Sequence, residues 1–131
     1  MTDPTHPNIA LLSQLDLRNL DECAPIFADD FVWHYFNPKL SELEGDHRGI
    51  EGLKSFFMKL GRISNGSFRV NVIDTRAVGD ELVVVHVCDS LMLGGDSIEI
   101  DVVVVWRIVN GKIVEAWDIP SAYSRRDIQQ D

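Results

Sequence analysis

The sequence predicts an α+β domain in which helices from the first half of the chain pack on one face of a curved antiparallel sheet. Apolar residues recur at helical spacing only before Ser67, and after it come four β-rich segments joined by tight turns. The 131 residues suit a single domain. Because a strongly twisted sheet curls, the helices close it only in part, and a ligand site is expected between sheet and helices.

Three helices are expected. The first covers residues 8–20, where leucines and isoleucine follow a Pro-Asn start that is typical of a helix N-terminus. Asp21 can cap a second, short helix over 21–28. The third covers 49–60, which carries an apolar stripe and is followed by glycine.

Five strands are expected. The aromatic run at 31–36 predicts the first, and Asn37-Pro38 ends it. The other four are expected at 68–77, 81–93, 97–109 and 112–119. The Asn110-Gly111 turn between the last two is the strongest short-range hairpin signal in the chain.

Composition and charge exclude several classes of function. The net charge is −9 and the pI is near 4.7, and no cluster of lysine or arginine is present. Binding to nucleic acid or to an anionic membrane surface is therefore not expected. The histidines and the two cysteines have no metal-ligand spacing, and no nucleotide-binding glycine motif occurs, so neither a metal nor a cofactor is predicted.

The sequence also gives an expectation for the domain bounds and for the cellular location of the protein. We expect one domain over residues 8–120, with tails at 1–7 and 121–131. The first residues are polar and no apolar run of about 18 residues is present, which predicts no secretory signal, no membrane helix and a cytoplasmic protein.

Three stretches resemble one known superfamily. They are "FADDFVWH", "GDHRGIEGLKSFF" and "VVWRIVNGKIVEAWD", which begin at residues 27, 45 and 104. They resemble the nuclear-transport-factor-2-like superfamily, and within it the SnoaL-like branch of polyketide cyclases and ketosteroid isomerase-like proteins, over about residues 8–120. The resemblance implies a cone-shaped sheet around three helices, a deep pocket, and homodimers formed through the outer face of the sheet.

Two residues acquire a role from this resemblance. Asp118 matches the carboxylate that SnoaL-like cyclases use as general acid and base, and His34 stands where ketosteroid isomerases place an aspartate base. His86 and Cys88 occupy the strand where epoxide hydrolases of the superfamily would need arginine and aspartate, which disfavours that reaction.

The residues themselves leave alternatives open. Strand alternation puts His34 on one face with Val32 and Phe36, while Trp33 and Tyr35 take the other, so His34 is either a pocket residue or a core histidine. Alternation also places Ile113 on the face opposite Asp118. Asp118 can serve as a general base or cap the turn before Pro120. His86 lies on an apolar strand face and has the same two readings.

The favoured hypothesis is a cofactor-free enzyme acting on a small hydrophobic carbonyl compound, of the polyketide-cyclase or isomerase type. Asp118 would abstract a proton, and His34 or His86 would donate to the carbonyl oxygen. The expected apolar wall consists of Trp33, Tyr35, Phe36, Phe56 and Phe57. The alternatives are a non-catalytic binding or dimerisation domain, and a dehydratase with a His–Asp pair.

The valine-rich strands also predict a partner. Residues 83–85 and 102–105 are all valine, so the outer face of the sheet would expose an apolar patch. Such patches mark interfaces, which supports a homodimer.

Overall fold

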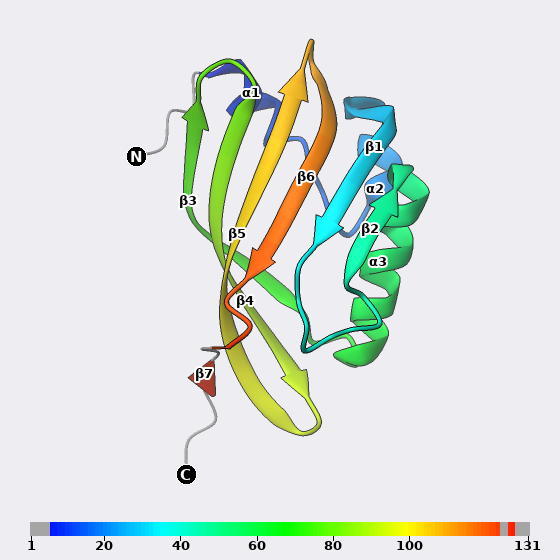
Figure 1. Ribbon diagram of the computed structural model, residues 1–131, viewed down its shortest axis with the longest axis vertical. Helices are drawn as coiled ribbons and strands as arrows, with labels where there is room; N and C mark the ends of the chain where they lie inside the picture. The colour runs from blue at the N-terminus through cyan, green and yellow to red at the C-terminus, as the bar shows by residue number, and fades with distance from the viewer. Residues whose placement is uncertain (1–5, 124–125, 128–131) are drawn as a thin grey trace.

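A strongly curved sheet is the main element of the protein in the computed structural model, which describes residues 6–123 and 126–127 (Figure 1). Six of its strands follow the order β2-β1-β6-β5-β4-β3, and β7 pairs with β5. The strands are β1 (Phe27–Tyr35), β2 (Gly45–Arg48), β3 (Arg69–Val78), β4 (Leu82–Leu93), β5 (Asp96–Val109), β6 (Lys112–Pro120) and β7 (Arg126–Asp127). The α+β class predicted from the sequence is confirmed.

The first two helices are shorter than expected. They are α1 (Pro7–Leu12) and α2 (Leu20–Cys23), and a 3₁₀ turn, η1 (Ala24–Ile26), follows α2. After α1 the chain turns, because the carboxylate of Asp16 accepts a bond from the backbone N–H of Arg18. Pro25 has no N–H to continue α2.

Helix α3 (Gly49–Ile63) begins where the sequence predicts and runs one turn further. Its apolar stripe buries Leu53, Phe56 and Leu60. The helix packs against β1 and β2, and Figure 1 shows it along that edge of the sheet. It therefore covers one side of the curved inner face.

The strands β3 to β6 form the antiparallel meander that the turns predict. Asn110 and Gly111 both have positive φ, of 52° and 76°, as a tight hairpin turn requires. The pairing of β1 is different, because it lies parallel to β6. The sheet is therefore mixed at this one pair, which local sequence patterns could not indicate.

The two faces of the sheet differ in character. Alternate residues of β1, such as Trp33 and Tyr35, are buried on the inner face, while their neighbours Val32 and His34 point outward. A bulge interrupts this alternation in β6, where Ile108 pairs with Ile113 but the preceding Arg107 pairs with Glu115. The expectation that Ile113 lies on the face opposite Asp118 is wrong for this reason, since Ile113 is fully buried.

The predicted tails fall mainly outside the described residues. Of the expected tail 1–7, residues 1–5 lie outside them, and His6 caps α1 by accepting a bond from Asn8 N–H at 3.1 Å. Of the expected tail 121–131, residues 124–125 and 128–131 lie outside them, and β7 pairs with β5. Within the described part of the chain, no helix is both long and apolar enough to cross a membrane.

Two glycines of α3 provide a matched test of its packing on β2. A Cβ at Gly52 would stand 2.9 Å from the backbone carbon of His47, whereas a Cβ at Gly61 would meet nothing within 4 Å. We expect Gly52→Ala to lower the free energy of unfolding. Gly61→Ala should raise it by up to about 1 kcal/mol, because alanine favours helix over glycine. Urea unfolding measures both, and equal effects of the two variants would refute this packing.

Candidate functional site

Two cavities meet on the inner face of the sheet, with volumes of about 480 Å³ and about 930 Å³. They share five lining residues, which are Phe57, Phe68, Asp89, Val102 and Asp118. Two carboxyl groups therefore stand at the junction of the cavities, among apolar side chains. We name Asp89 and Asp118 the carboxyl pair.

Asp118 is held at the centre of the sheet. On β6 it pairs with Val104 of β5 on one side and with Tyr35 of β1 on the other. Its side chain is buried, and Oδ1 has no hydrogen-bond partner among the described residues. Burial raises the pKa of Asp118 well above its ordinary value, and the nearby charge of Asp89 adds to this shift.

Asp89 is a candidate site residue that the sequence analysis missed. It follows Val85 and Val87 on the inner face of β4 and, like Asp118, lines both cavities. Burial raises the pKa of Asp89 to about 7. The signal was present in the sequence, because an acid in phase with buried valines is unusual.

Tyr35 adds a hydroxyl group beside the pair. Its oxygen accepts a bond of 2.9 Å from the side-chain amide of the buried Asn37, and both residues line the smaller cavity. Burial raises the pKa of Tyr35, so the phenol keeps its proton. That proton is free to be donated to a bound molecule.

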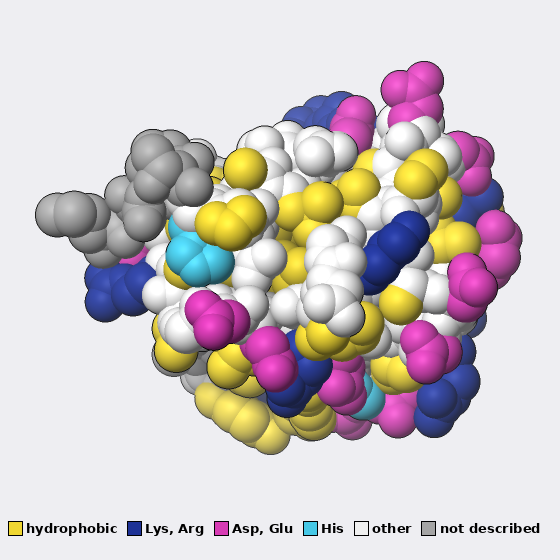
Figure 2. Space-filling view, turned by 90° about the horizontal axis from the view of Figure 1, so that it is seen from above, with side chains coloured by type: hydrophobic (Ala, Val, Ile, Leu, Met, Phe, Trp, Pro, Cys, Tyr) yellow, Lys and Arg dark blue, Asp and Glu magenta, His cyan; other side chains and the backbone are white. Residues whose placement is uncertain are grey.

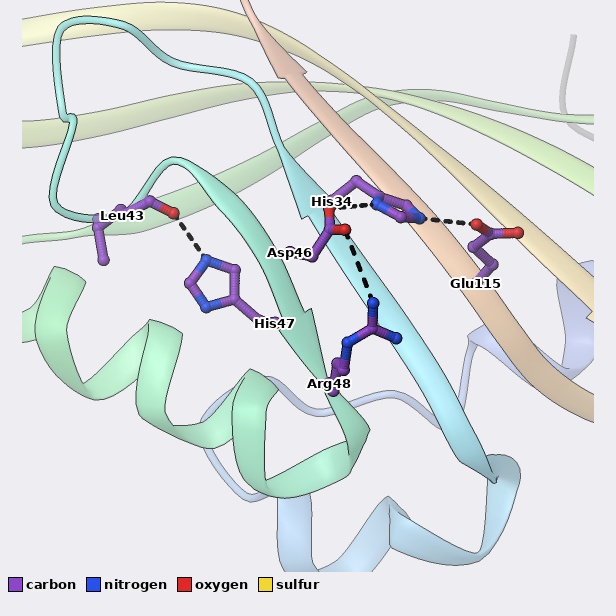
Figure 3. Close-up of polar contacts among 6 residues, drawn as sticks. All are labelled: His34, Leu43, Asp46, His47, Arg48 and Glu115. Carbon is purple, nitrogen blue, oxygen red and sulfur yellow. Dashed lines mark hydrogen bonds and ion pairs between the residues drawn. The ribbon is translucent and has the colours of Figure 1, made fainter.

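His34 lies on the opposite side of β1 from the cavities, because it stands between Trp33 and Tyr35, which line them. Figure 3 shows its ring between Asp46 and Glu115. Its Nδ1 is 2.7 Å from Asp46 of β2, and its Nε2 is 2.7 Å from Glu115 of β6. The ring also stacks on Trp117 at 5.5 Å. The hypothesis that His34 shares a cavity with Asp118 does not agree with this placement, because Tyr35 and Trp33 take the inner positions of the strand.

The carboxylates around His34 determine its charge. Two ionised carboxylates can be bonded at once only if both ring nitrogens carry protons. Burial of the ring opposes the positive charge, but the hydrogen bonds to Asp46 and Glu115 outweigh it and raise the pKa of His34. The bond to His34 in turn lowers the pKa of Asp46. His34 is therefore a cationic link between β2, β1 and β6.

His86 is also on the outer face. It shares that face with Val84 and Cys88, as alternation predicts, but this face points away from the cavities, and its Nε2 lies 3.0 Å from Asp101. The hypothesis that His86 donates to the carbonyl oxygen of a substrate beside Asp118 does not agree with this geometry. His47 donates from Nε2 to the backbone oxygen of Leu43 at 2.7 Å.

The predicted apolar wall divides among three places. Trp33 lines the larger cavity, Tyr35 the smaller one and Phe57 both. Phe56 is buried among the rings behind the wall, with Trp33 at 5.6 Å and Tyr35 at 4.8 Å. Phe36 is 48% exposed and lines neither cavity, because it follows His34 on the outer face.

Among the described residues, no group of three or more His, Cys, Asp or Glu side chains is arranged to hold a metal ion. What the site offers is a pair of proton-carrying groups in an apolar cavity. These groups can bind, donate or accept protons at a polar atom of a hydrophobic ligand.

The sequence pattern of the SnoaL-like domain matches residues 10–116. The chain belongs to the SnoaL-like domain family. No curated protein matches the chain. The match covers helix α3 and strand β4, which carries Asp89, and it ends within β6, two residues before Asp118.

Solved structures share the fold of this SnoaL-like domain. A Xanthomonas campestris protein of unknown function with a cystatin-like fold is 22% identical, with 92% of each chain covered and a TM-score of 0.73. A nuclear-transport-factor-2-like protein from Anabaena variabilis is 14% identical, with 92% of this chain and 94% of that chain covered and a TM-score of 0.70. TerC, crystallised with polyporic acid, is 23% identical, with 86% and 90% covered and a TM-score of 0.73.

The cationic link makes a prediction for pH dependence. Because the pKa of His34 is raised in the folded state, its stabilising effect is complete below the ordinary histidine pKa and is lost as the pH rises through the folded value. NMR titration should show His34 titrating above its ordinary value and Asp46→Asn lowering that pKa. Asp21→Asn, which breaks the separate Asp21–Lys54 pair, should leave it unchanged. A His34 resonance that titrates at the ordinary value would contradict the link.

The buried Asp89 makes a prediction of opposite sign. Its raised pKa means that ionisation opposes folding, so stability is lost as the pH rises from the ordinary aspartate value to about 7. Asp89→Asn removes this loss. The free energy of unfolding of Asp89→Asn, relative to the wild type, should therefore be higher at pH 8 than at pH 4.

Urea unfolding at the two pH values measures this difference. Asp96→Asn, at an exposed position, is the control and should show the same difference from the wild type at both. The prediction fails if Asp89→Asn behaves like Asp96→Asn.

Proposed function

We propose that this SnoaL-like domain catalyses proton transfer on a hydrophobic carbonyl compound, as an isomerase or cyclase does. The observation that carries the proposal is the carboxyl pair, which stands buried where two cavities meet. Enzymes that move protons next to a carbonyl group use groups whose pKa is shifted toward neutrality.

The pair can divide the roles of acid and base. Two neighbouring carboxyl groups in an apolar site do not both ionise, so the pair holds one proton when one of them is ionised. Asp118 is the more deeply buried and keeps the proton, while Asp89, with a pKa of about 7, is the group that ionises near neutral pH. We therefore assign the base to Asp89 and the proton donor to Asp118, in place of the sequence-based hypothesis that Asp118 abstracts the proton.

The reaction would then proceed through an enol. The Asp89 carboxylate takes a proton from the carbon next to the carbonyl group, and the electrons of the C–H bond move to the carbonyl oxygen. Asp118 supplies the proton for that oxygen, and the Tyr35 hydroxyl donates a hydrogen bond to it. In an isomerisation, Asp89 gives its proton to another carbon of a conjugated enol while the enol O–H proton returns to Asp118. In a cyclisation, the enol carbon attacks a second carbonyl group, whose oxygen takes the proton from Asp89, and the enol O–H proton again returns to Asp118. Each step uses side chains of this chain.

The remaining lining suits an apolar substrate. Leucine, valine and aromatic side chains make up most of the larger cavity. TerC, which has the same fold, was crystallised with polyporic acid. Figure 2 views the end of the molecule at which α1 lies, and hydrophobic side chains spread over its middle while acidic ones lie at the edge.

The alternative of a dehydratase with a His–Asp pair has no support from this geometry, because His34 and His86 lie on the outer face. A non-catalytic binding domain would use the same cavities. It differs from the enzyme in one measurable respect, since binding alone leaves the protons of the ligand unexchanged.

Deuterium exchange tests the proposal. The probe is 2-tetralone, a flat hydrophobic ketone with acidic protons next to its carbonyl group, observed by NMR in D₂O. We expect the protein to accelerate exchange, and Asp89→Asn to slow it by about 100-fold or more, the usual contribution of a general base. Asp118→Asn should slow it by a smaller factor, because the amide still donates a hydrogen bond but not a proton.

Asp101→Asn, on the outer face, is the matched control and should exchange 2-tetralone at the wild-type rate. Wild-type rates in both Asp89→Asn and Asp118→Asn would overturn the proposal. Binding of 2-tetralone without accelerated exchange would favour the binding domain.

We also propose that two copies of the chain associate through the outer face of the sheet. Neighbouring strands place Val103 beside Ile119 and Val105 beside Trp117 on this face, and Val103 and Ile119 are 38% and 46% exposed. The Arg107–Glu81 ion pair brings charges of both signs to this face, and His86 lies beside Val103 with its Nε2 3.0 Å from Asp101. A patch with both signs at its edge can complement a two-fold copy of itself.

A charge in this patch should separate the copies. We expect Val103→Glu to convert a dimer into a monomer in sedimentation experiments, because the new carboxylate would be buried without a partner. Met58→Glu, at a residue that is 62% exposed on α3, should leave the mass unchanged. A wild-type chain that sediments as a monomer at all concentrations would refute this association.

A further inference from the structure

Three buried side-chain atoms have no hydrogen-bond partner among the described residues. They are Oδ1 of Asp89, Oδ1 of Asp118 and the indole Nε1 of Trp33. All three residues line the larger cavity. The proposed proton transfer gives the two carboxyl oxygens a role. The indole N–H is a hydrogen-bond donor only, so it has no role in that proton transfer.

The Trp33 ring is held firmly in place. It is 2% exposed and lies between Phe56, Phe57 and Trp106, with ring centroids 5.5 to 5.8 Å away. A buried donor left without a partner costs about 1–3 kcal/mol, so a bound acceptor at this atom would be favoured. The fixed ring gives that acceptor a defined position.

The position of Trp33 relative to the reacting groups follows from the strands. Trp33 precedes Tyr35 by two residues on the inner face of β1, and Tyr35 pairs with Asp118 while Trp33 pairs with Ala116. Same-face neighbours on a strand are about 7 Å apart. On the inner face, the backbone position of Trp33 is therefore about the width of a fused ring away from that of Tyr35, which pairs with Asp118.

We propose that the Trp33 indole N–H recognises a second oxygen atom of the substrate. The substrate is then an apolar ring compound with two oxygen acceptors, one at the carboxyl pair and one about a ring's width further into the larger cavity. The first of these positions rests on the proposed function, and the second does not. Trp33 acts here as a specificity-determining residue and takes no part in proton transfer.

A pair of matched ketones tests this recognition. The probes are 6-methoxy-2-tetralone and 6-ethyl-2-tetralone, which have similar shape but differ in the second oxygen. The wild type should bind the methoxy compound about 2- to 10-fold more tightly, as expected for one net hydrogen bond. Trp33→Phe keeps a ring but removes the N–H, so it should bind the two compounds equally.

Two controls separate this inference from the proposed function. Trp117→Phe removes an indole on the outer face and should keep the preference for the methoxy compound. Asp89→Asn should lose exchange of the ketone protons but also keep the preference. If exchange is absent in the wild type and the preference remains, the proposed function fails and the recognition by Trp33 stands.

A measurement on the wild type does not depend on the folding of a variant. With ¹⁵N-labelled tryptophan, the indole N–H resonance of Trp33 should move downfield when the methoxy compound binds and should move less with the ethyl compound. Equal shifts with both probes, or an unchanged preference in a folded Trp33→Phe variant, would overturn the proposal.

Discussion

The parallel pairing of β1 with β6 is the constraint on which the rest of the structure depends. It joins the N-terminal half of the chain to its last strand and places Tyr35 beside Asp118 on the inner face. On the outer face the same pairing sets His34 beside Trp117 and within reach of Glu115. One set of backbone hydrogen bonds therefore builds both the candidate site and the cationic link behind it.

Local sequence patterns predicted the elements that depend on neighbouring residues. The antiparallel strands β3 to β6 and the Asn110-Gly111 turn are such elements, because each strand pairs with the next one along the chain across a short turn. Helix α1 was predicted too long because the leucine spacing continues after the helix ends, and Leu15 and Leu17 still pack on the core without being helical. The spacing of apolar residues indicates which side chains are buried. It indicates a helix only where the backbone hydrogen bonds of the helix also continue.

The candidate site was predicted in part. Strand alternation gave the correct partners on each face of β1 and β4, but it does not say which face is the inner one. On β1 both faces are apolar enough to pass for the core, so His34 could not be distinguished from Trp33 by pattern. On β4 both His86 and Asp89 stand among apolar residues in the sequence, and only the structure shows that the buried valines at 83, 85 and 87 share the face of Asp89. The side of a strand is decided by the strands next to it, and these are distant in the sequence.

The carboxyl pair and the His34 link place charge in contrasting environments. The outer histidine is matched by two carboxylates and holds strands together. Among the described residues that line the cavities, the cations are Lys39, Arg18 and Arg69. The pKa values of both inner acids are raised by burial, so their ionisation opposes folding. A site that raises the pKa of its acids by burial gives up some stability at neutral pH to have protons available there.

The bulge in β6 has a consequence for how this domain can change. Between the hairpin turn and Asp118, the extra residue at Ile113–Val114 separates the register of the hairpin end of the strand from the register of the end that carries Asp118. Insertions or deletions near the turn can therefore be absorbed at the bulge, without rotating Asp118 to the other face. Such an element lets the hairpin end of the sheet vary in length while the carboxyl pair keeps its place on the inner face.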